Sequence, residues 1–335
     1  MNITIVTCVK NEGPFLLEWI AHNRNLGVTD FLFYSNDCTD GTDDLLDALD
    51  EHGIVKHLPN PAKEGQKYQM TALKAAPGED IVKDADWVFV TDVDEFLNIS
   101  VGAGRLPDLI EACGNPMAIS VTMRMMANSG ISDYVDEPVI AQFNQTHDPE
   151  LWGDQTAIEV KSLTRKDFPL GYFGAHRPFI HDSYDVKGNV PRWTNGSGGQ
   201  VPFPFLTAAM KRRRHKFPAK GVRNFASLNH YTLRSLDSYL VKSERGDVNR
   251  KYRNFTLDYW RDRNDNRVHD TSIHKYLPYL VAEMSCLKSL SGVGELHEKT
   301  VKNHREKIAK LRTDPTFEDL RLTLISNSPD LELSV

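Results

Sequence analysis

The sequence lacks the usual signals of a membrane-spanning, zinc-binding or nucleic-acid-binding protein. None of its apolar runs approaches the roughly 20 residues that a helix needs to cross a bilayer. Cysteine is scarce, and Cys8, Cys38, Cys113 and Cys286 match no zinc spacing, which favours reduced thiols. The net charge of −6 excludes the broad basic surface of a general nucleic-acid binder. Lys10 interrupts the first apolar run too early for a signal peptide, so we expect a cytoplasmic protein; peripheral membrane contact stays open.

The first hundred residues alternate between strand and helix signals. Short apolar or β-branched runs predict strands at 3–9, 31–34, 54–58 and 87–91. Helices are predicted from Pro14 to a stop at Gly27, around Leu45 to Leu49, and over 66–75. This repetition predicts a parallel sheet with helices on both faces.

The pattern changes after about residue 115. Strands are predicted at 118–123 and 160–164, a loop at 188–200, and helices at 236–245, 273–286 and 295–311. We therefore divide the chain into an α/β nucleotide-sugar half at 1–125, an acceptor-binding and sheet-completing half at 126–235, and a C-terminal helical region at 236–335.

Polar clusters follow three of the predicted strands, at Lys10–Glu12, Asn36–Asp37 and Asp92–Asp94. Ligands of open α/β sheets bind beyond the carboxyl ends of the strands, so we expect these clusters to share one site. Two carboxylates at i and i+2 suit a hard cation such as Mg²⁺ or Mn²⁺, which in turn holds substrate phosphates. The alternative for Asp92–Asp94 is a solvated turn, and for Asn36–Thr42 it is an Asx turn that caps the next helix.

The chain resembles the family-two glycosyltransferases, especially the subgroup with a D-x-D-E-F metal motif. The resemblance is carried by Ile5–Glu12, Ser35–Thr42, Phe89–Phe96, Leu228–Tyr231 and Lys242–Gly246. It implies a GT-A fold: a Rossmann-like mixed α/β sheet flanked by helices, here with a C-terminal helical extension. It also implies an inverting transfer of sugar from a nucleotide-diphosphate sugar to a glycan or a lipid-linked acceptor, as in polysaccharide biosynthesis.

The resemblance also implies a set of site residues. Asp92 and Asp94 would hold Mn²⁺ or Mg²⁺, with Asp94 the firmer ligand and thus a catalytic residue. The donor nucleotide would contact Thr7, Asn11, Glu12, Asp37, Gln66, Gln69 and Asp92, with Lys67 competing for the role of the two glutamines.

Further candidates come from the second half of the chain. The imidazole of His230 can complete the metal coordination or bond a diphosphate oxygen. Lys242 and Arg245 lie three residues apart on one helix face, where they can neutralise the leaving diphosphate. An inverting enzyme needs a carboxylate base for the acceptor hydroxyl. We favour Asp154 in Trp152-Gly153-Asp154; the alternatives are Glu159, Glu244 and Asp247.

Two other hypotheses for the function stay open. No Glu-Asp catalytic pair occurs where the resemblance places one, which is compatible with an inactive carbohydrate-binding protein of the same fold. A nucleotidyltransferase would need a glycine-rich loop after the first strand, and Lys10–Pro14 contains one glycine. The basic run Lys211–Lys216 is either a solvated loop or a site for an anionic acceptor.

Overall fold

The computed structural model describes residues 1–63, 65–148, 159–210, 217, 220–246, 256–328 and 330–331. Its strands are β1 (Ile3–Val9), β2 (Asp30–Ser35), β3 (Lys56–Pro59), β4 (Trp87–Val90), β5 (Glu95–Ile99), β6 (Ala118–Met125), β7 (Gln145–Thr146), β8 (Val160–Arg165), β9 (Leu170–Phe173), β10 (Pro178–Ile180), β11 (Trp193–Asn195), β12 (Ala226–His230) and β13 (Val268–His269).

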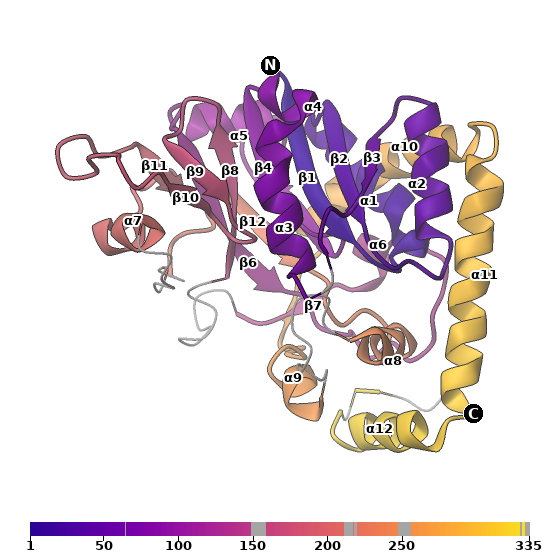
Figure 1. Ribbon diagram of the computed structural model, residues 1–335. Helices are drawn as coiled ribbons and strands as arrows, with labels where there is room; N and C mark the ends of the chain where they lie inside the picture. The colour runs from indigo at the N-terminus through magenta and orange to yellow at the C-terminus, as the bar shows by residue number, and fades with distance from the viewer. Residues whose placement is uncertain are drawn as a thin grey trace.

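The helices surround these strands (Figure 1). They are α1 (Gly13–Leu26), α2 (Thr42–Glu51), α3 (Tyr68–Ala75), α4 (Asp80–Lys83), α5 (Leu106–Ala112), α6 (Val139–Gln142), α7 (Phe203–Met210), α8 (Leu236–Arg245), α9 (Leu257–Arg261), α10 (Leu277–Lys288), α11 (Val293–Arg312) and α12 (Pro315–Ser326), with 3-10 turns at Ala76–Gly78 and Ser272–Tyr276.

A nine-stranded sheet forms the centre of the molecule, in the order β3-β2-β1-β4-β8-β6-β12-β5, with β11 paired to β6. β1 to β4 are parallel, β8 runs antiparallel to both β4 and β6, and β12 runs parallel to β6. The carboxyl ends of β1, β2, β4 and β12 therefore meet the start of β8 at one edge. The predicted fold class, a mixed α/β sheet flanked by helices with a C-terminal helical extension, is confirmed.

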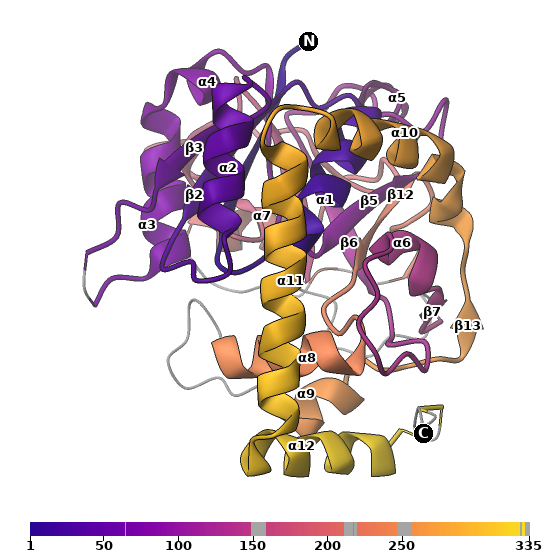
Figure 2. The same ribbon diagram turned by 90° about the vertical axis from the view of Figure 1, so that its right-hand side faces the viewer.

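The sheet is covered on both faces. One face packs on α1, α2 and α10 through a core that includes Trp19, Leu45 and Leu280, and the other packs on α3 through Ala72 and Leu73. The long helix α11 passes α1 and α2 and reaches α8 and α12 at its far end (Figure 2). A separate cluster of apolar side chains joins α8 to α9, α11 and α12, so the position of α8 is fixed from the C-terminal region.

Several predicted boundaries hold and others are wrong. α1 has Pro14 in its first turn and ends before Gly27, whose φ of 98° only glycine adopts readily. The predicted loop at 188–200 instead contains β11. This strand pairs with β6, and the side chain of its Trp193 is buried. The single helix predicted at 273–286 is a 3-10 turn followed by α10, and Pro278 lies in the first turn of α10. Among the described helices, none is both long and apolar enough for a bilayer span.

Candidate active site

The loops after β1 and β2 are tied together at the carboxyl edge of the sheet. Asn11 and Asp37 both have left-handed backbones, with φ of 52° and 49°. The Asn11 amide donates to Thr39 Oγ1 at 3.1 Å and its Oδ1 accepts from Thr39 N at 2.8 Å. Asp37 is 59% exposed and lies 4.0 Å from Lys10 Nζ. The two predicted nucleotide-binding loops therefore form one continuous rim, with Asp37 accessible and Asn11 occupied in holding the rim.

Glu12 lies behind this rim with both oxygens occupied. Oε2 accepts from Arg234 Nη1 at 2.9 Å and Oε1 from Arg245 Nη1 at 2.6 Å. Burial would raise the pKa of Glu12, but the two guanidinium groups lower it below its usual value. In this arrangement Glu12 anchors α8 and the segment after β12 to the end of β1.

Asp92 lies two residues after the end of β4, and both of its carboxylate oxygens are likewise held. Oδ1 accepts from Gln69 Nε2 on α3 at 3.2 Å, and Oδ2 from Lys161 Nζ on β8 at 2.7 Å. Lys161 is 1% exposed, whereas Asp92 is 37% exposed. Burial of the ammonium opposes its charge, yet Asp92 and Glu95 raise the pKa of Lys161. Gln69 therefore reaches the predicted site.

Glu95, the glutamate of the D-x-D-E-F motif, closes the turn between β4 and β5. Its Oε2 accepts from Thr91 Oγ1 at 2.8 Å and from Asp92 N at 2.9 Å, and lies 3.3 Å from Lys161 Nζ. Burial raises the pKa of Glu95 to about 7, with Lys161 opposing that rise and Asp92 adding to it. Glu95 therefore shapes the loop that presents Asp92 and Asp94.

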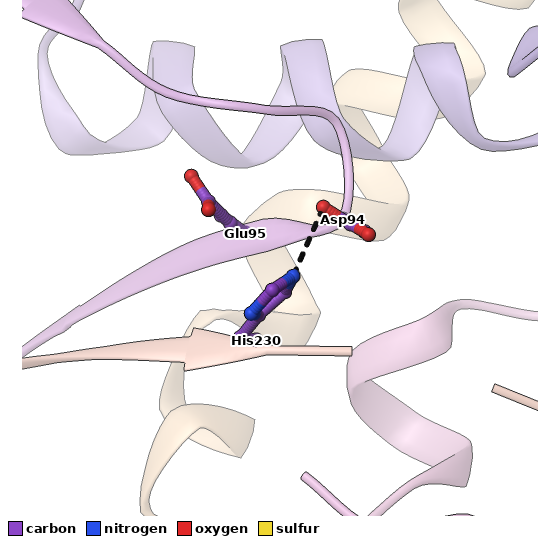
Figure 3. Close-up of side chains that lie close together, drawn as sticks. All are labelled: Asp94, Glu95 and His230. Atoms are coloured by element: carbon purple, nitrogen blue, oxygen red, sulfur yellow. Dashed lines mark ion pairs between the residues drawn. The ribbon is translucent and has the colours of Figure 1, made fainter. Parts of the chain in front are cut away.

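Asp94 and His230 face each other where β5 pairs with β12 (Figure 3). Asp94 Oδ1 lies 3.4 Å from His230 Nε2, and Oδ2 accepts from Lys242 Nζ at 2.8 Å. Lys242 also donates to the carbonyl and hydroxyl oxygens of Thr232, at 3.0 Å and 2.8 Å. Burial opposes the charge of Asp94, but Lys242 and His230 hold its pKa well below the usual range.

This pair fits a divalent cation. One ligand atom each from Asp94, Glu95 and His230 lies within 4.8 Å of the others. Neighbouring ligands of an octahedral ion with bonds of about 2.1 Å lie about 3 Å apart, close to the Asp94–His230 separation. Because Lys242 binds the other oxygen of Asp94, Oδ1 can take a cation without displacing Lys242. Asp92 was predicted as a ligand but is not in this group of three.

The two predicted cations of α8 both point into the site rather than into solvent. Lys242 binds Asp94, as described, and Arg245 Nη1 donates to the carbonyls of Lys10 and Asn11 at 2.6 Å and 3.2 Å. Burial would lower the pKa of Arg245, but Glu12 raises it. Neither side chain therefore lies on a solvated helix face.

The remaining predicted residues are less central. Thr7 is buried on β1, and its Oγ1 has no hydrogen-bond partner within the described residues. Gln66 precedes α3, and its Oε1 accepts from Lys63 N at 3.0 Å, away from Asp92. Asp154 lies outside the described residues, as do Trp152, Asp247 and the basic run at 211–216.

Two functional residues were missed in the sequence. Lys161 is a lysine within a predicted strand, and a lysine is rarely buried there without a partner, which would have been a usable signal. Arg234 left no such signal, because it lies in a polar segment before α8, and only the fold brings it to Glu12. It also covers the ring of Phe15 at 3.5 Å.

Comparison with known proteins places the match in the first half of the chain. Residues 3–167 match the model of Glycosyltransferase family 92. A glycosyltransferase family 92 protein of Oryza sativa subsp. japonica is 27% identical over 112 residues, which are 32% of this chain and 18% of the relative. One from Ricinus communis is 29% identical over 117 residues, 34% of this chain and 20% of the relative. The chain thus spans about a fifth of the length of these relatives.

Two solved structures show a weak likeness to this chain. TarS of S. aureus in complex with UDP-GlcNAc has a TM-score of 0.34 at 9% identity, covering 98% of this chain and 80% of that chain. A glucosyl-3-phosphoglycerate synthase from Mycobacterium tuberculosis, with Mn²⁺, UDP and glucosyl-3-phosphoglycerate, has a TM-score of 0.29 at 16% identity, covering 50% and 58%.

The family result refines the resemblance seen in the sequence. The matched model is that of family 92, and assignment to family two stays a prediction. All four site acids, Glu12, Asp92, Asp94 and Glu95, lie inside the matched region. Residues 3–167 therefore resemble glycosyltransferase family 92, which supports the predicted glycosyltransferase enzyme.

Proposed function

We propose that this protein transfers a sugar from a nucleotide-diphosphate sugar to a glycan or lipid-linked acceptor, with inversion and with Mn²⁺ or Mg²⁺. The observation that carries the proposal is the pairing of Asp94 Oδ1 with His230 Nε2 at 3.4 Å on the carboxyl edge of the sheet. A carboxylate and an imidazole are suitable ligands for Mn²⁺, and this edge is where α/β sheets bind nucleotides.

The protein residues have distinct tasks in this proposal. Asp94 and His230 hold the cation, which when bound offsets negative charge on the diphosphate. Asp37 is placed on the accessible rim to contact the nucleoside. Lys242 and Arg245 supply two positive charges beside the position of the diphosphate. These charges stabilise the negative charge that develops on the diphosphate in the transition state. Asp92 is oriented by Gln69 and Lys161, so that its exposed edge can accept from a donor hydroxyl.

The proposal is tested by nucleotide binding with and without the cation. UDP, GDP, CMP and dTDP are titrated calorimetrically into the full chain, with Mn²⁺ or with EDTA. We expect one nucleoside diphosphate to bind at least tenfold more tightly with Mn²⁺, and Asp94→Asn to remove that gain. Asp80→Asn is the control, because Asp80 is exposed and pairs with Lys83, three residues on. An unchanged Mn²⁺ effect in Asp94→Asn would contradict the metal assignment.

The alternatives give different results in the same samples. Hydrolysis of the matching nucleotide sugar, followed by chromatography of the released diphosphate, separates an enzyme from an inactive carbohydrate-binding protein. A nucleotidyltransferase would release pyrophosphate from a nucleoside triphosphate and a sugar phosphate instead.

A further inference from the structure

Two described carboxylates at the site edge, Asp37 and Glu159, are not held by a close cation, and Asp37 is 59% exposed. Glu12, Asp92, Asp94 and Glu95 each have a Lys or Arg nitrogen within 3.3 Å. Within the described part of the chain, Glu159 forms an ion pair with Arg263, whose Nη2 lies 3.7 Å from Oε1. Its Oε2 is buried and has no hydrogen-bond partner among the residues that the structure describes. A buried carboxylate oxygen without a donor is costly, so its retention calls for a role.

Glu159 lies at the edge because of the direction of β8. This strand runs antiparallel to β4 and β6, so the residue before its first position lies at the carboxyl edge of the parallel strands. The carbonyl of Glu159 accepts from Met123 N at 3.0 Å, which continues the pairing with β6 by one step. The backbone of Glu159 is therefore fixed by the sheet, unlike that of a residue in a free loop.

The spacing along the strand turns Glu159 toward the acids. Residues two apart share one side of a strand and lie about 6.6 Å from each other. Lys161, two residues on, reaches both Asp92 and Glu95. Glu159 thus stands on the same side as Lys161, one repeat farther out from the sheet. Its side chain is 24% exposed although Oε2 is buried, which leaves Oε1 open to a bound acceptor.

We propose that Glu159 is the general base of the transfer, which rests on the function proposed above. Glu159 takes the proton of the acceptor hydroxyl while the acceptor oxygen forms its bond to the anomeric carbon. The bond from that carbon to the diphosphate oxygen breaks, and its electron pair leaves with the nucleoside diphosphate. The proton ends on Glu159 and the negative charge on the leaving group. Because Oε2 is buried, Oε1 is the oxygen that receives the proton, and Arg263 Nη2 lies 3.7 Å from it.

The competing carboxylates differ from Glu159 in observable ways. Glu244 lies on α8 and its Oε1 accepts from Lys307 Nζ at 2.9 Å, so it is engaged with α11. Asp154, the base favoured from the sequence, and Asp247 lie outside the described residues. Glu159→Gln, Asp154→Asn and Glu244→Gln therefore form a matched set, in which each variant removes one charge and keeps the side-chain shape.

The test measures donor binding and turnover separately in this set. Since the acceptor is unidentified, turnover is measured as Mn²⁺-dependent hydrolysis of the nucleotide sugar that binds, and as transfer to a panel of p-nitrophenyl glycosides. We expect Glu159→Gln to bind the nucleoside diphosphate within twofold of the native protein and to lose about 10²- to 10⁴-fold in turnover. The acidic limb of its rate–pH profile should disappear, which a merely structural role would not cause.

The outcomes separate this proposal from the one on which it rests. If Asp154→Asn or Glu244→Gln loses turnover and Glu159→Gln does not, the base is assigned wrongly while the transferase stands. If Glu159→Gln retains the acidic limb of its profile, the role as base is overturned whatever the rate. If the native protein binds no nucleoside diphosphate with Mn²⁺, the proposed function itself fails.

Discussion

The acids of the site and the cations that bind them come from two different regions of the chain. Glu12, Asp92, Asp94 and Glu95 lie within the first 95 residues, each close after a strand of the parallel half-sheet. Their cationic partners come later, from β8 and from the segment around α8, at Lys161, Arg234, Lys242 and Arg245. The family match at 3–167 includes every one of the acids but only the first of these cations.

This difference shows how the site is assembled. An acid directly after a strand is placed by the strand itself, so its position depends on local structure. A cation that reaches it across 66 or more positions is placed by packing, here by the sheet order around β8 and by the apolar cluster under α8. The matched region is therefore incomplete as a site, and β12 and α8 supply His230 and two of the cations.

Among the substitutions considered, the loss of Lys161 should have the largest effect on the pairing between the acids and their cations. Lys161→Met leaves Asp92 and Glu95 without their shared cation in a site where the lysine is almost fully buried. Removing one member of a buried ion pair costs about 3–5 kcal/mol, and we expect a loss of that size in the free energy of unfolding. Urea denaturation followed by circular dichroism measures it.

Lys166→Met is the matched control for that substitution. Lys166 also pairs with an aspartate, Asp86, but at an exposed position near the end of β8. Exposed pairs contribute little because solvent and salt screen them, so its urea midpoint should stay near the native one. Equal midpoints for Lys161→Met and Lys166→Met would show that the buried cation does not stabilise the acids.

Glu18 allows a second comparison among the acids of the first region. It is buried like Glu12 and Asp94, but backbone N–H groups rather than close cations hold its carboxylate. Its oxygens accept from Val139 N at 2.8 Å and Ile140 N at 3.1 Å. Burial raises its pKa from 4.5 to about 7, against the effect of these two bonds. By contrast, close cations lower the pKa of Glu12 and Asp94 in the same half of the chain.

The raised pKa of Glu18 predicts a pH effect with a definite sign. Between pH 4.5 and 7 the folded protein binds more protons at Glu18 than the unfolded chain does, so stability falls as pH rises through this window. The fall reaches up to about 3 kcal/mol, at about 1.36 kcal/mol per pKa unit. Glu18→Gln should remove it, so the difference in unfolding free energy between the two proteins should change across the window.

The controls for this experiment are within the same chain. His22, His147 and His304, whose pKa values burial lowers to about 4, give a slope of the opposite sign in both proteins and cancel in the difference. Glu51→Gln, at an exposed position that ends α2, should run parallel to the native protein. Parallel curves for Glu18→Gln as well would contradict the raised pKa.

Much of the fold could be predicted because its signals are local. The alternation of apolar runs with Pro14 and Gly27 predicts β1, α1 and their order, and the strand-end acids predict the edge that carries the site. β5 and β12 were not fully recognised, because their antiparallel pairing joins segments about 130 residues apart. Asp94, His230, Lys242 and Arg245 do come together; Lys161 and Arg234 were missed, because only the sheet order shows what they face.

The smallest of the three expected effects tests whether a cation outside the matched region belongs to the site. Arg245 Nη1 donates to the carbonyls of Lys10 and Asn11 and to Glu12 Oε1. Arg245→Lys keeps the charge but loses the planar guanidinium, so the bonds to the two carbonyls should be lost first. We expect a loss of about 1–2 kcal/mol in the free energy of unfolding. Because those carbonyls belong to the rim, nucleotide affinity with Mn²⁺ should fall severalfold in the same variant. Arg261→Lys on α9 is the control, since Arg261 is half exposed and far in sequence from the rim. If Arg245→Lys matches Arg261→Lys in both measurements, the cations of α8 are dispensable and the site lies within the first half of the chain.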